Sequence, residues 1–131
     1  MALEMNRDFR EGFSEENSLR SFLNDPDCWL FAAVEGQRIV GFAYGYALQR
    51  MNTERKMLYI HEVGVLDAYQ RQGIGTRLLE ALKKACAEKG FCKMCLTCYQ
   101  SNEAANALYR KAGGKLCAES QGQDTVYWFQ L

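Results

Sequence analysis

Apolar and polar positions follow two different periods along this chain, and the changes of period predict its elements. Near the N-terminus, Ser14 with acids in the following turn is typical of a helix N-cap, and residues 15–23 carry one apolar face. The sequence Asn-Asp-Pro at positions 24–26 should end this helix. Phe9 and Phe13, four residues apart, indicate a short helix before it.

A β-hairpin and a third strand are expected next. Residues 29–34 (WLFAAV) and 38–48 (RIVGFAYGYAL) are rich in β-branched and aromatic side chains, and a Glu-Gly-Gln turn separates them. The polar residues 49–56 then indicate a connection to an apolar strand over residues 57–66. Three strands should therefore precede the next helix.

The second half of the chain predicts two more helices and three more strands. A helix with one apolar face follows Gly75 and ends at Lys89-Gly90. The later elements are a strand over 91–99, a helix capped by Ser101 or Asn102 and closed by Gly113-Gly114, and strands over 115–119 and 125–131. This order indicates an α/β fold with a mixed sheet in a single domain, residues 1–131.

The composition agrees with one globular domain and excludes several partners. The 131 residues are 48% hydrophobic and carry 16 basic and 16 acidic side chains. The sequence contains no block of basic residues that could follow a nucleic-acid backbone. Residues 1–17 hold acids and lack the apolar core of a signal peptide, and no stretch approaches the roughly 20 apolar residues of a membrane helix. We expect a cytoplasmic protein with reduced cysteines and with no nucleic-acid or membrane partner.

Three of the six cysteines, Cys92, Cys95 and Cys98, have the spacing C-x-x-C-x-x-C. This spacing also occurs in metal-cluster sites. The surrounding residues are apolar and β-prone, so Cys95 should face away from the other two, which would lie about 20 Å apart at roughly 3.3 Å per residue. We therefore expect small buried thiols and no metal site.

A glycine-containing loop, YQRQGIGT at residues 69–76, joins the third strand to the following helix. Backbone N–H groups at a helix N-terminus form an anion site, and glycine lets a phosphate approach closely. The loop is not a dinucleotide fingerprint, because position 78 is leucine, and the chain holds no Walker sequence. The pattern that remains is Q-x-x-G-x-G, at Gln70, Gly73 and Gly75.

In this strand-loop-helix setting, the pattern resembles motif A of the GNAT superfamily of N-acetyltransferases, whose loop binds the pyrophosphate of acetyl-coenzyme A. The segment SNEAANALYRKAGG, residues 101–114, resembles the superfamily's N-x-x-A-x-x-L-Y-x-K-x-G-F segment. The resemblance implies a central, mostly antiparallel sheet flanked by helices. Two departures stand out: the usual first strand is not visible in residues 1–17, and Gly114 replaces the final aromatic residue.

The resemblance also implies roles for individual residues. Those expected to bind acetyl-coenzyme A are Val63, Gly64 and Val65 at the pantetheine arm, Gln70, Arg71, Gln72, Gly73, Ile74, Gly75 and Thr76 at the pyrophosphate, and Asn102 and Asn106 at the cofactor arm. Tyr109 resembles the tyrosine that hydrogen-bonds the thioester sulfur, with packing on an apolar helix face as the alternative.

Acetylation of an amine requires a neutral nitrogen, a polarised thioester carbonyl and a proton for the thiolate. Glu62 is the favoured general base, backbone N–H groups near Val63 can polarise the carbonyl, and Tyr109 can donate to sulfur. His61 and water are the alternative bases, since strand alternation sends His61 and Glu62 to opposite faces unless a β-bulge shifts the parity. Direct transfer is favoured over an acetylated Cys98, which has no evident histidine partner.

The acceptor is the least determined part of this prediction. The sequence YIHEVGV, residues 59–65, resembles the Y-I-x-D/E-x-x-V of aminoglycoside 3-N-acetyltransferases of the gentamicin type, which implies a small, polycationic amine. The acidic residues that could line its site are Glu62, Asp67 and Glu54, with Glu15, Glu16, Asp25 and Asp27 unplaced.

Three other possibilities stay open. The acceptor could be a protein, polyamine or metabolite amine, because the motifs fix the donor better than the acceptor. The domain could also bind acyl-coenzyme A as a sensor without turnover. The C-terminal TVYWFQL, residues 125–131, could form a homodimer interface or pack in the core.

Overall fold

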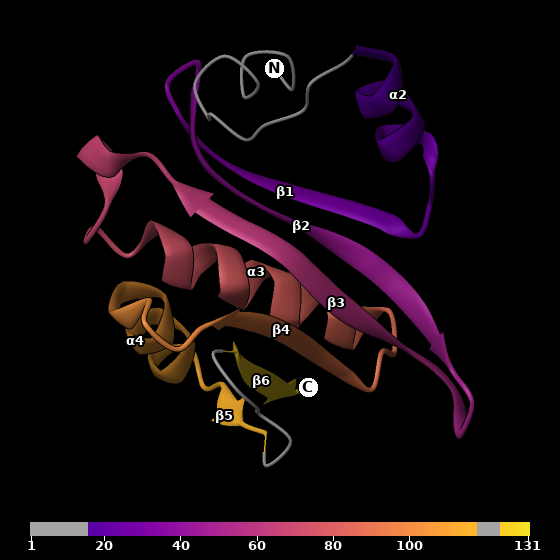
Figure 1. Cartoon of the computed structure of the whole chain (residues 1–131). Coiled ribbons are helices and arrows are strands. Elements are labelled where there is room, and N and C mark those ends of the chain that lie inside the picture. The colour runs from indigo at the N-terminus through magenta and orange to yellow at the C-terminus, as the bar shows by residue number, and fades with distance from the viewer. Residues whose placement is uncertain (1–15, 118–123) are drawn as a thin grey trace.

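The structure, a computed structural model that describes residues 16–117 and 124–131, is built on a six-stranded mixed sheet (Figure 1). The strands are β1 (Cys28–Glu35), β2 (Arg38–Arg50), β3 (Thr53–Val65), β4 (Lys93–Tyr99), β5 (Lys115–Leu116) and β6 (Asp124–Gln130). Their order in the sheet is β1-β2-β3-β4-β6-β5, and only β3 and β4 pair in parallel. The helices are α2 (Glu16–Asn24), α3 (Ile74–Glu88) and α4 (Glu103–Lys111), with the 3-10 helix η1 (Asp67–Tyr69). The expected mostly antiparallel sheet is confirmed.

The order of elements matches the prediction, but one boundary was wrong. Residues 49–56, expected as a polar connection, belong mostly to β2 and β3, which run to a tight turn at Met51-Asn52. Their polar side chains are largely exposed there, so the strands continue where the apolar pattern ends. The predicted helix at Phe9 and Phe13, the Ser14 cap and the missing first strand all lie outside the described residues.

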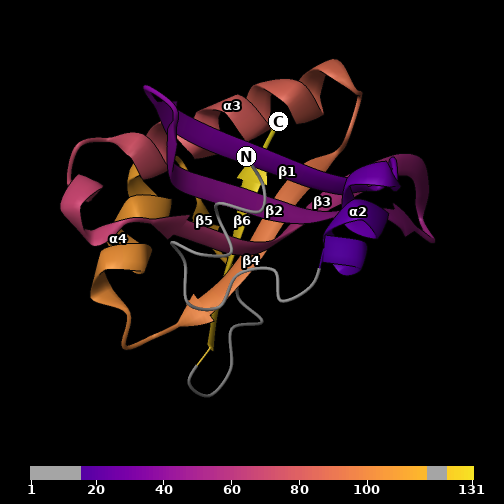
Figure 2. The same ribbon diagram turned by 90° about the horizontal axis from the view of Figure 1, so that it is seen from above.

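Helices cover the two faces of the sheet differently (Figure 2). On one face, α3 and α4 pack on alternate residues of β2, β3, β4 and β6; the buried cluster includes Ala43, Leu58, Ile60, Leu79, Leu82, Met94, Leu96, Tyr109, Tyr127 and Phe129. On the other face, Phe22 of α2 meets the rings of Tyr44 and Tyr46 at centroid distances of 5.6 and 6.0 Å. Because Tyr44 alternates with Ala43 along β2, α2 and α3 lie on opposite faces. Within the described ranges, no helix is long and apolar enough to span a bilayer.

The C-terminal strand belongs partly to the core. Tyr127 and Phe129 of β6 are completely buried, which favours core packing for these two aromatic residues. The Phe129 ring also lies against Gly114, where an added Cβ would come within 2.8 Å of the ring. An aromatic side chain from β6 therefore fills space beside Gly114, the position at which the expected motif has phenylalanine.

A β-bulge interrupts the pairing of β2 with β3. Tyr44 lies opposite Glu62, but the next residue, Gly45, lies opposite Ile60, so His61 is an extra residue of β3. Gly45 has no room for a side chain, because an added Cβ would overlap the Tyr59 carbonyl oxygen and come within 2.8 Å of the Ile60 Cα. The bulge therefore requires glycine on the facing strand.

We predict that Gly45→Ala lowers the free energy of unfolding by about 3 kcal/mol or more, because the new methyl group meets backbone that cannot move aside. Gly41→Ala, on the same strand, is the matched control. Its Cβ would approach the Ile74 methyl group at 3.0 Å, so we expect a loss of about 1 kcal/mol. Urea unfolding measures both values. Equal losses in the two variants would contradict the backbone clash.

Candidate active site

The two parallel strands at the centre of the sheet separate towards their C-terminal ends. Pairing joins Met57–Ile60 to Lys93–Leu96, whereas β3 continues to Val65 and β4 to Tyr99 without further pairing to each other. On its other edge, β3 remains paired with β2 as far as Val65. The edge of residues 63–65 that faces β4 thus has no strand partner among the described residues, and its backbone groups can bind a ligand.

The N-terminus of α3 lies at the same end of the molecule as this opening (Figure 1). Gly73 is the N-cap residue, with a left-handed φ of 81°, and it provides no side-chain cap. Arg71 also has a positive φ, of 63°. The first N–H groups of a helix have no intrahelical acceptor, and together with the helix dipole they attract an anion. This loop therefore has the geometry of a phosphate site, with the exposed Arg71 beside it.

Two exposed glutamine side chains stabilise the loop through hydrogen bonds. The Gln70 amide donates to the Val65 carbonyl oxygen at 3.1 Å and to an Asp67 carboxylate oxygen at 3.3 Å. The Gln72 amide donates to the Ala68 carbonyl oxygen at 3.4 Å. These bonds tie the loop to the end of β3 and to η1. The side chains of Gln70 and Gln72 thus shape the loop, and its backbone is the part that can face a ligand.

The start of α3 is fixed by close packing. An added Cβ at Gly75 would come within 2.9 Å of the Leu108 side chain, so this glycine lets α3 approach α4. The Ile74 side chain lies near Gly41 of β2 and holds the other side of the helix. Thr76 is half-buried in the same turn. Of the predicted pyrophosphate residues, Ile74 and Gly75 therefore position the helix through their packing.

Asn106 is the buried polar residue among those described, with 6% of its surface exposed. Its amide nitrogen donates to the carbonyl oxygens of Asn102 at 2.7 Å and Tyr99 at 3.1 Å. Its amide oxygen accepts from the hydroxyls of Tyr127 at 2.7 Å and Thr125 at 3.1 Å. This residue joins α4 to the end of β4 and to β6, and its hydrogen-bonding groups are occupied in doing so.

The neighbouring Asn102 begins α4. Its side-chain oxygen accepts a hydrogen bond from the Ala105 N–H at 3.1 Å, so the cap falls on Asn102 rather than on Ser101. Asn102 is exposed at the surface, beside the end of β4. The two asparagines expected at the cofactor arm thus differ: Asn102 is accessible, and Asn106 lies behind it.

Tyr109 is 7% exposed and packs against Tyr127, with ring centroids 5.7 Å apart. Val63 and Cys98, from the ends of β3 and β4, pack against the same cluster. Burial, with a smaller effect of Cys98, raises the pKa of the Tyr109 phenol to about 12. The phenol therefore keeps its proton at neutral pH and can donate it. Both predictions for this residue, proton donor and core packing, are compatible with its position.

His61 and Glu62 lie on the same side of the sheet, which corrects the expectation from simple alternation. The His61 ring stacks on Tyr44 at 5.3 Å, and Tyr44 lies directly opposite Glu62 in the pairing of β2 with β3. Burial and then the Glu62 charge raise the pKa of Tyr44 to about 12. The bulge is the physical reason, because its extra residue resets the alternation at this point of β3.

Sequence reasoning missed the aromatic residues of β2. Phe42, Tyr44 and Tyr46 occupy alternate positions and share one face, and His61 contacts both tyrosines. The alternating F-A-Y-G-Y of residues 42–46 could have indicated an aromatic face on this strand. Its position beside Glu62 could not be found from sequence, because that depends on the register of β2 with β3.

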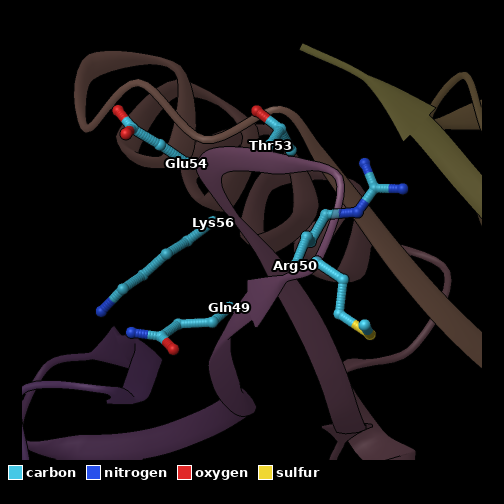
Figure 3. Close-up of a pocket in the computed structure, with 6 residues that line it drawn as sticks. Gln49, Arg50, Thr53, Glu54 and Lys56 are labelled. Carbon is cyan, nitrogen blue, oxygen red and sulfur yellow. The ribbon is translucent and has the colours of Figure 1, made fainter.

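The acidic residues proposed for the acceptor wall do not gather at one place. Glu54 lies beside the β2–β3 turn and helps to line a shallow depression with Gln49, Arg50, Met51, Thr53 and Lys56 (Figure 3). Asp27 pairs with Lys56 at 2.9 Å, near the same end of β3. At about 3.3 Å per residue, Glu54 is roughly 26 Å from Glu62 along the strand.

Of the proposed acids that the structure describes, two lie near the separating strands. Glu62 is in β3, and Asp67 begins η1 directly after that strand. Asp25 is exposed in the connection before β1. Glu15 and the side chain of Glu16 lie outside the described residues.

The three closely spaced cysteines have different surroundings. Cys92 accepts a hydrogen bond from the Arg50 guanidinium at 3.3 Å, whereas the Cys98 sulfur lies 3.2 Å from the Thr125 hydroxyl. Burial raises the pKa of the Cys95 thiol. All six cysteines are free thiols. We assign none of them a catalytic part.

Comparison with known proteins agrees with this geometry. A model described as the acetyltransferase (GNAT) family matches residues 1–114. The chain belongs to this family. The GNAT fold expected from the glycine loop and from the segment at residues 101–114 is thus confirmed.

Solved structures give the broadest similarity to this GNAT chain. An aminoglycoside acetyltransferase from an uncultured soil metagenomic sample is 29% identical in its complex with trehalose, with a TM-score of 0.81. Its complex with sisomicin gives 28% identity and a TM-score of 0.80. In both cases the match covers 92% of this chain and 82% of the other. An N-acetyltransferase of Thermoplasma acidophilum in complex with coenzyme A, 17% identical with a TM-score of 0.75, shares the fold across 98% of this chain and 86% of its own.

The curated relatives are named for a different amine. Thialysine N-epsilon-acetyltransferase of Mus musculus is 28% identical over 88 residues, which are 67% of this chain and 51% of the relative. The protein of the same name from Sus scrofa is 26% identical over the same shares. This GNAT chain therefore spans about half the length of the curated relatives it matches.

We predict that Asn106→Ala lowers the free energy of unfolding of this GNAT domain by about 3 kcal/mol, since it leaves the buried partners of the amide unpaired. Tyr127→Phe removes a single donor to the amide oxygen and should cost about 1 kcal/mol. Urea unfolding distinguishes the two. If Asn106→Ala proved no worse than Tyr127→Phe, the amide would not hold α4 to β4 and β6.

Proposed function

We propose that this GNAT protein transfers the acetyl group of acetyl-coenzyme A directly to a primary amine, and that the amine belongs to an aminoglycoside such as gentamicin. One observation carries the first part of this proposal. The two central strands separate at the end where a helix begins with a glycine N-cap in a left-handed conformation. A long, phosphate-bearing thioester can bind with its arm between the strands and its pyrophosphate at the helix.

The donor would be held mainly by backbone groups. Residues 63–65 offer N–H and C=O groups to the pantetheine arm, and the loop from Gln70 to Thr76 offers N–H groups to the pyrophosphate. Gly73 leaves room there, because an added Cβ would have no neighbour within 4 Å and would point into open space. Arg71 adds a positive charge, and Asn102 can reach the arm from the start of α4.

The chemistry needs a proton acceptor for the amine and a proton donor for the departing thiolate. Glu62 accepts a proton from the acceptor ammonium, directly or through water, and the neutral nitrogen then attacks the thioester carbon. Backbone N–H groups near Val63 stabilise the developing negative charge on the carbonyl oxygen. A C–N bond forms, the C–S bond breaks, and Tyr109 gives its proton to the departing thiolate. The nitrogen loses its second proton to solvent as the amide forms, Glu62 releases its proton to solvent, and the tyrosine regains one from solvent, so that one proton is released overall. No covalent enzyme intermediate is required.

The aminoglycoside acceptor is supported by breadth of similarity. The similarity to the soil acetyltransferase with sisomicin covers 92% of this chain, and residues 59–65 resemble the strand pattern of gentamicin-type acetyltransferases. A thialysine-like amine is the second candidate, supported by the curated relatives over 67% of the chain. The carboxylates of Glu62 and Asp67 fit either cation.

We predict mono-acetylated gentamicin or sisomicin, detected by mass spectrometry, when the purified protein is incubated with acetyl-coenzyme A. The panel also contains thialysine, spermidine, and lysine and N-terminal peptides, and a reaction without protein is the control. Mass detection avoids interference from the six thiols in a colour assay. A product with thialysine alone would show that the protein is an acetyltransferase but that its acceptor is not an aminoglycoside. No product, with acetyl-coenzyme A bound, would favour a sensor without turnover.

A second prediction concerns the proton-transfer residues. Glu62→Gln should lower kcat about a hundredfold and Tyr109→Phe about tenfold or more, because each removes one acid–base group. Calorimetry should show the dissociation constant of acetyl-coenzyme A changing less than threefold in both. His61→Asn tests the alternative base and should keep kcat within a few-fold of the wild type. A large loss in His61→Asn with none in Glu62→Gln would reverse the assignment.

A further inference from the structure

Tyr44 and Glu62 are directly opposite each other on β2 and β3. Directly opposed residues of an antiparallel pair share one face, with Cβ atoms about 4.5–5.5 Å apart. The pairing holds only because the bulge at His61 inserts one residue into β3 just before Glu62. Without this insertion the register would slip by one position, and another residue would face Tyr44.

The Tyr44 ring is held by its neighbours. The rings of Phe22, Phe42 and His61 lie at centroid distances of 5.6, 6.1 and 5.3 Å, and Tyr46 lies at 6.4 Å. These rings come from α2, β2 and β3. A side chain surrounded in this way has little rotational freedom left, so its hydroxyl points in a fixed direction.

The hydroxyl of Tyr44 interacts electrostatically with the carboxylate of Glu62, the residue opposite it. Burial and the Glu62 charge raise the pKa of this phenol to about 12, so it remains a donor throughout the neutral range. An ionised carboxylate has about four lone-pair positions. The neighbouring Tyr44 hydroxyl can therefore donate to one of these positions and restrict the orientation of the carboxylate.

Resting on the proposed function, we propose that Tyr44 is a positioning residue, which holds the Glu62 carboxylate in the orientation that takes the proton from the acceptor ammonium. The proton moves from the amine nitrogen to a Glu62 oxygen. Tyr44 keeps its own proton and forms no bond with either substrate. The nitrogen lone pair released by this step then forms the C–N bond as the C–S bond breaks. The nitrogen loses its second proton to solvent, and the thiolate takes its proton from Tyr109.

Tyr44→Phe tests this role, because it keeps the ring and its packing but removes the hydroxyl. Tyr46→Phe is the matched control: Tyr46 lies on the same strand and face, contacts Phe22 and His61 as Tyr44 does, and has no hydroxyl partner in the part of the chain described. Each substitution is made in the wild-type chain and in Glu62→Gln. The measured quantities are kcat, the KM for acetyl-coenzyme A and the urea midpoint, with the amine that the wild type acetylates.

We expect Tyr44→Phe to lower kcat about tenfold, with the KM for acetyl-coenzyme A within twofold of the wild type. Tyr46→Phe should change neither value by more than twofold. In the Glu62→Gln background, Tyr44→Phe should lower kcat no further, because a residue that acts through Glu62 has no effect once the carboxylate is gone.

Three results would overturn the positioning role: wild-type kcat in Tyr44→Phe, an equal loss in Tyr46→Phe, or a further tenfold loss in the Glu62→Gln background. The last two would indicate general damage to the aromatic face, which the urea midpoint would register. A wild-type protein that binds acetyl-coenzyme A but acetylates no amine of the panel would overturn the proposed function itself, and this role with it.

Discussion

The arrangement of this site depends on one extra residue in β3. His61 has no counterpart on β2, and the glycine opposite, Gly45, gives the bulged strand the space that a side chain would take. After the bulge, the pairing register of β3 with β2 is shifted by one residue. Glu62 consequently faces Tyr44, while Val63 packs into the core with Tyr109 and Cys98. The insertion therefore places Glu62 on the face of the sheet beside α2 and Val63 on the apolar face beside α3 and α4.

The opposite wall of the opening has its own support. Asn106 is buried behind the end of β4 and uses one amide group to hold the start of α4, the end of β4 and the β6 hydroxyls together. Buried amides that are fully bonded make a local structure unique, because any alternative arrangement leaves polar groups unpaired. The two strands can separate without closing on each other since each is fixed from its outer side: β3 by β2, and β4 by β6 and α4.

Local features of this fold could be predicted from sequence, and long-range ones could not. The glycine loop before a helix, the cap at Ser101 or Asn102 and the apolar face of α3 depend on residues within a few positions of one another, and the structure contains the loop, a cap at Asn102 and the apolar face. The parity of Glu62, by contrast, depends on a bulge whose cause, Gly45, is separated from it by a complete hairpin turn. The prediction of a polar connection at residues 49–56 was wrong for a similar reason. Pairing between β2 and β3 maintains both strands there, although their side chains are not buried.

The distinction between local and long-range features also applies to the sites proposed for acetyl-coenzyme A and for the amine. A pyrophosphate is recognised by backbone N–H groups at a helix terminus, so its site is encoded in one short glycine pattern of neighbouring residues. The acceptor side that we propose depends on side chains of β2 and β3, including Tyr44 and Glu62, which come together only through the register of the sheet. No motif can contain such a set. It follows that the family resemblance constrains the donor strongly, whereas the amine must be deduced from the aromatic and acidic face that this particular chain places beside Glu62.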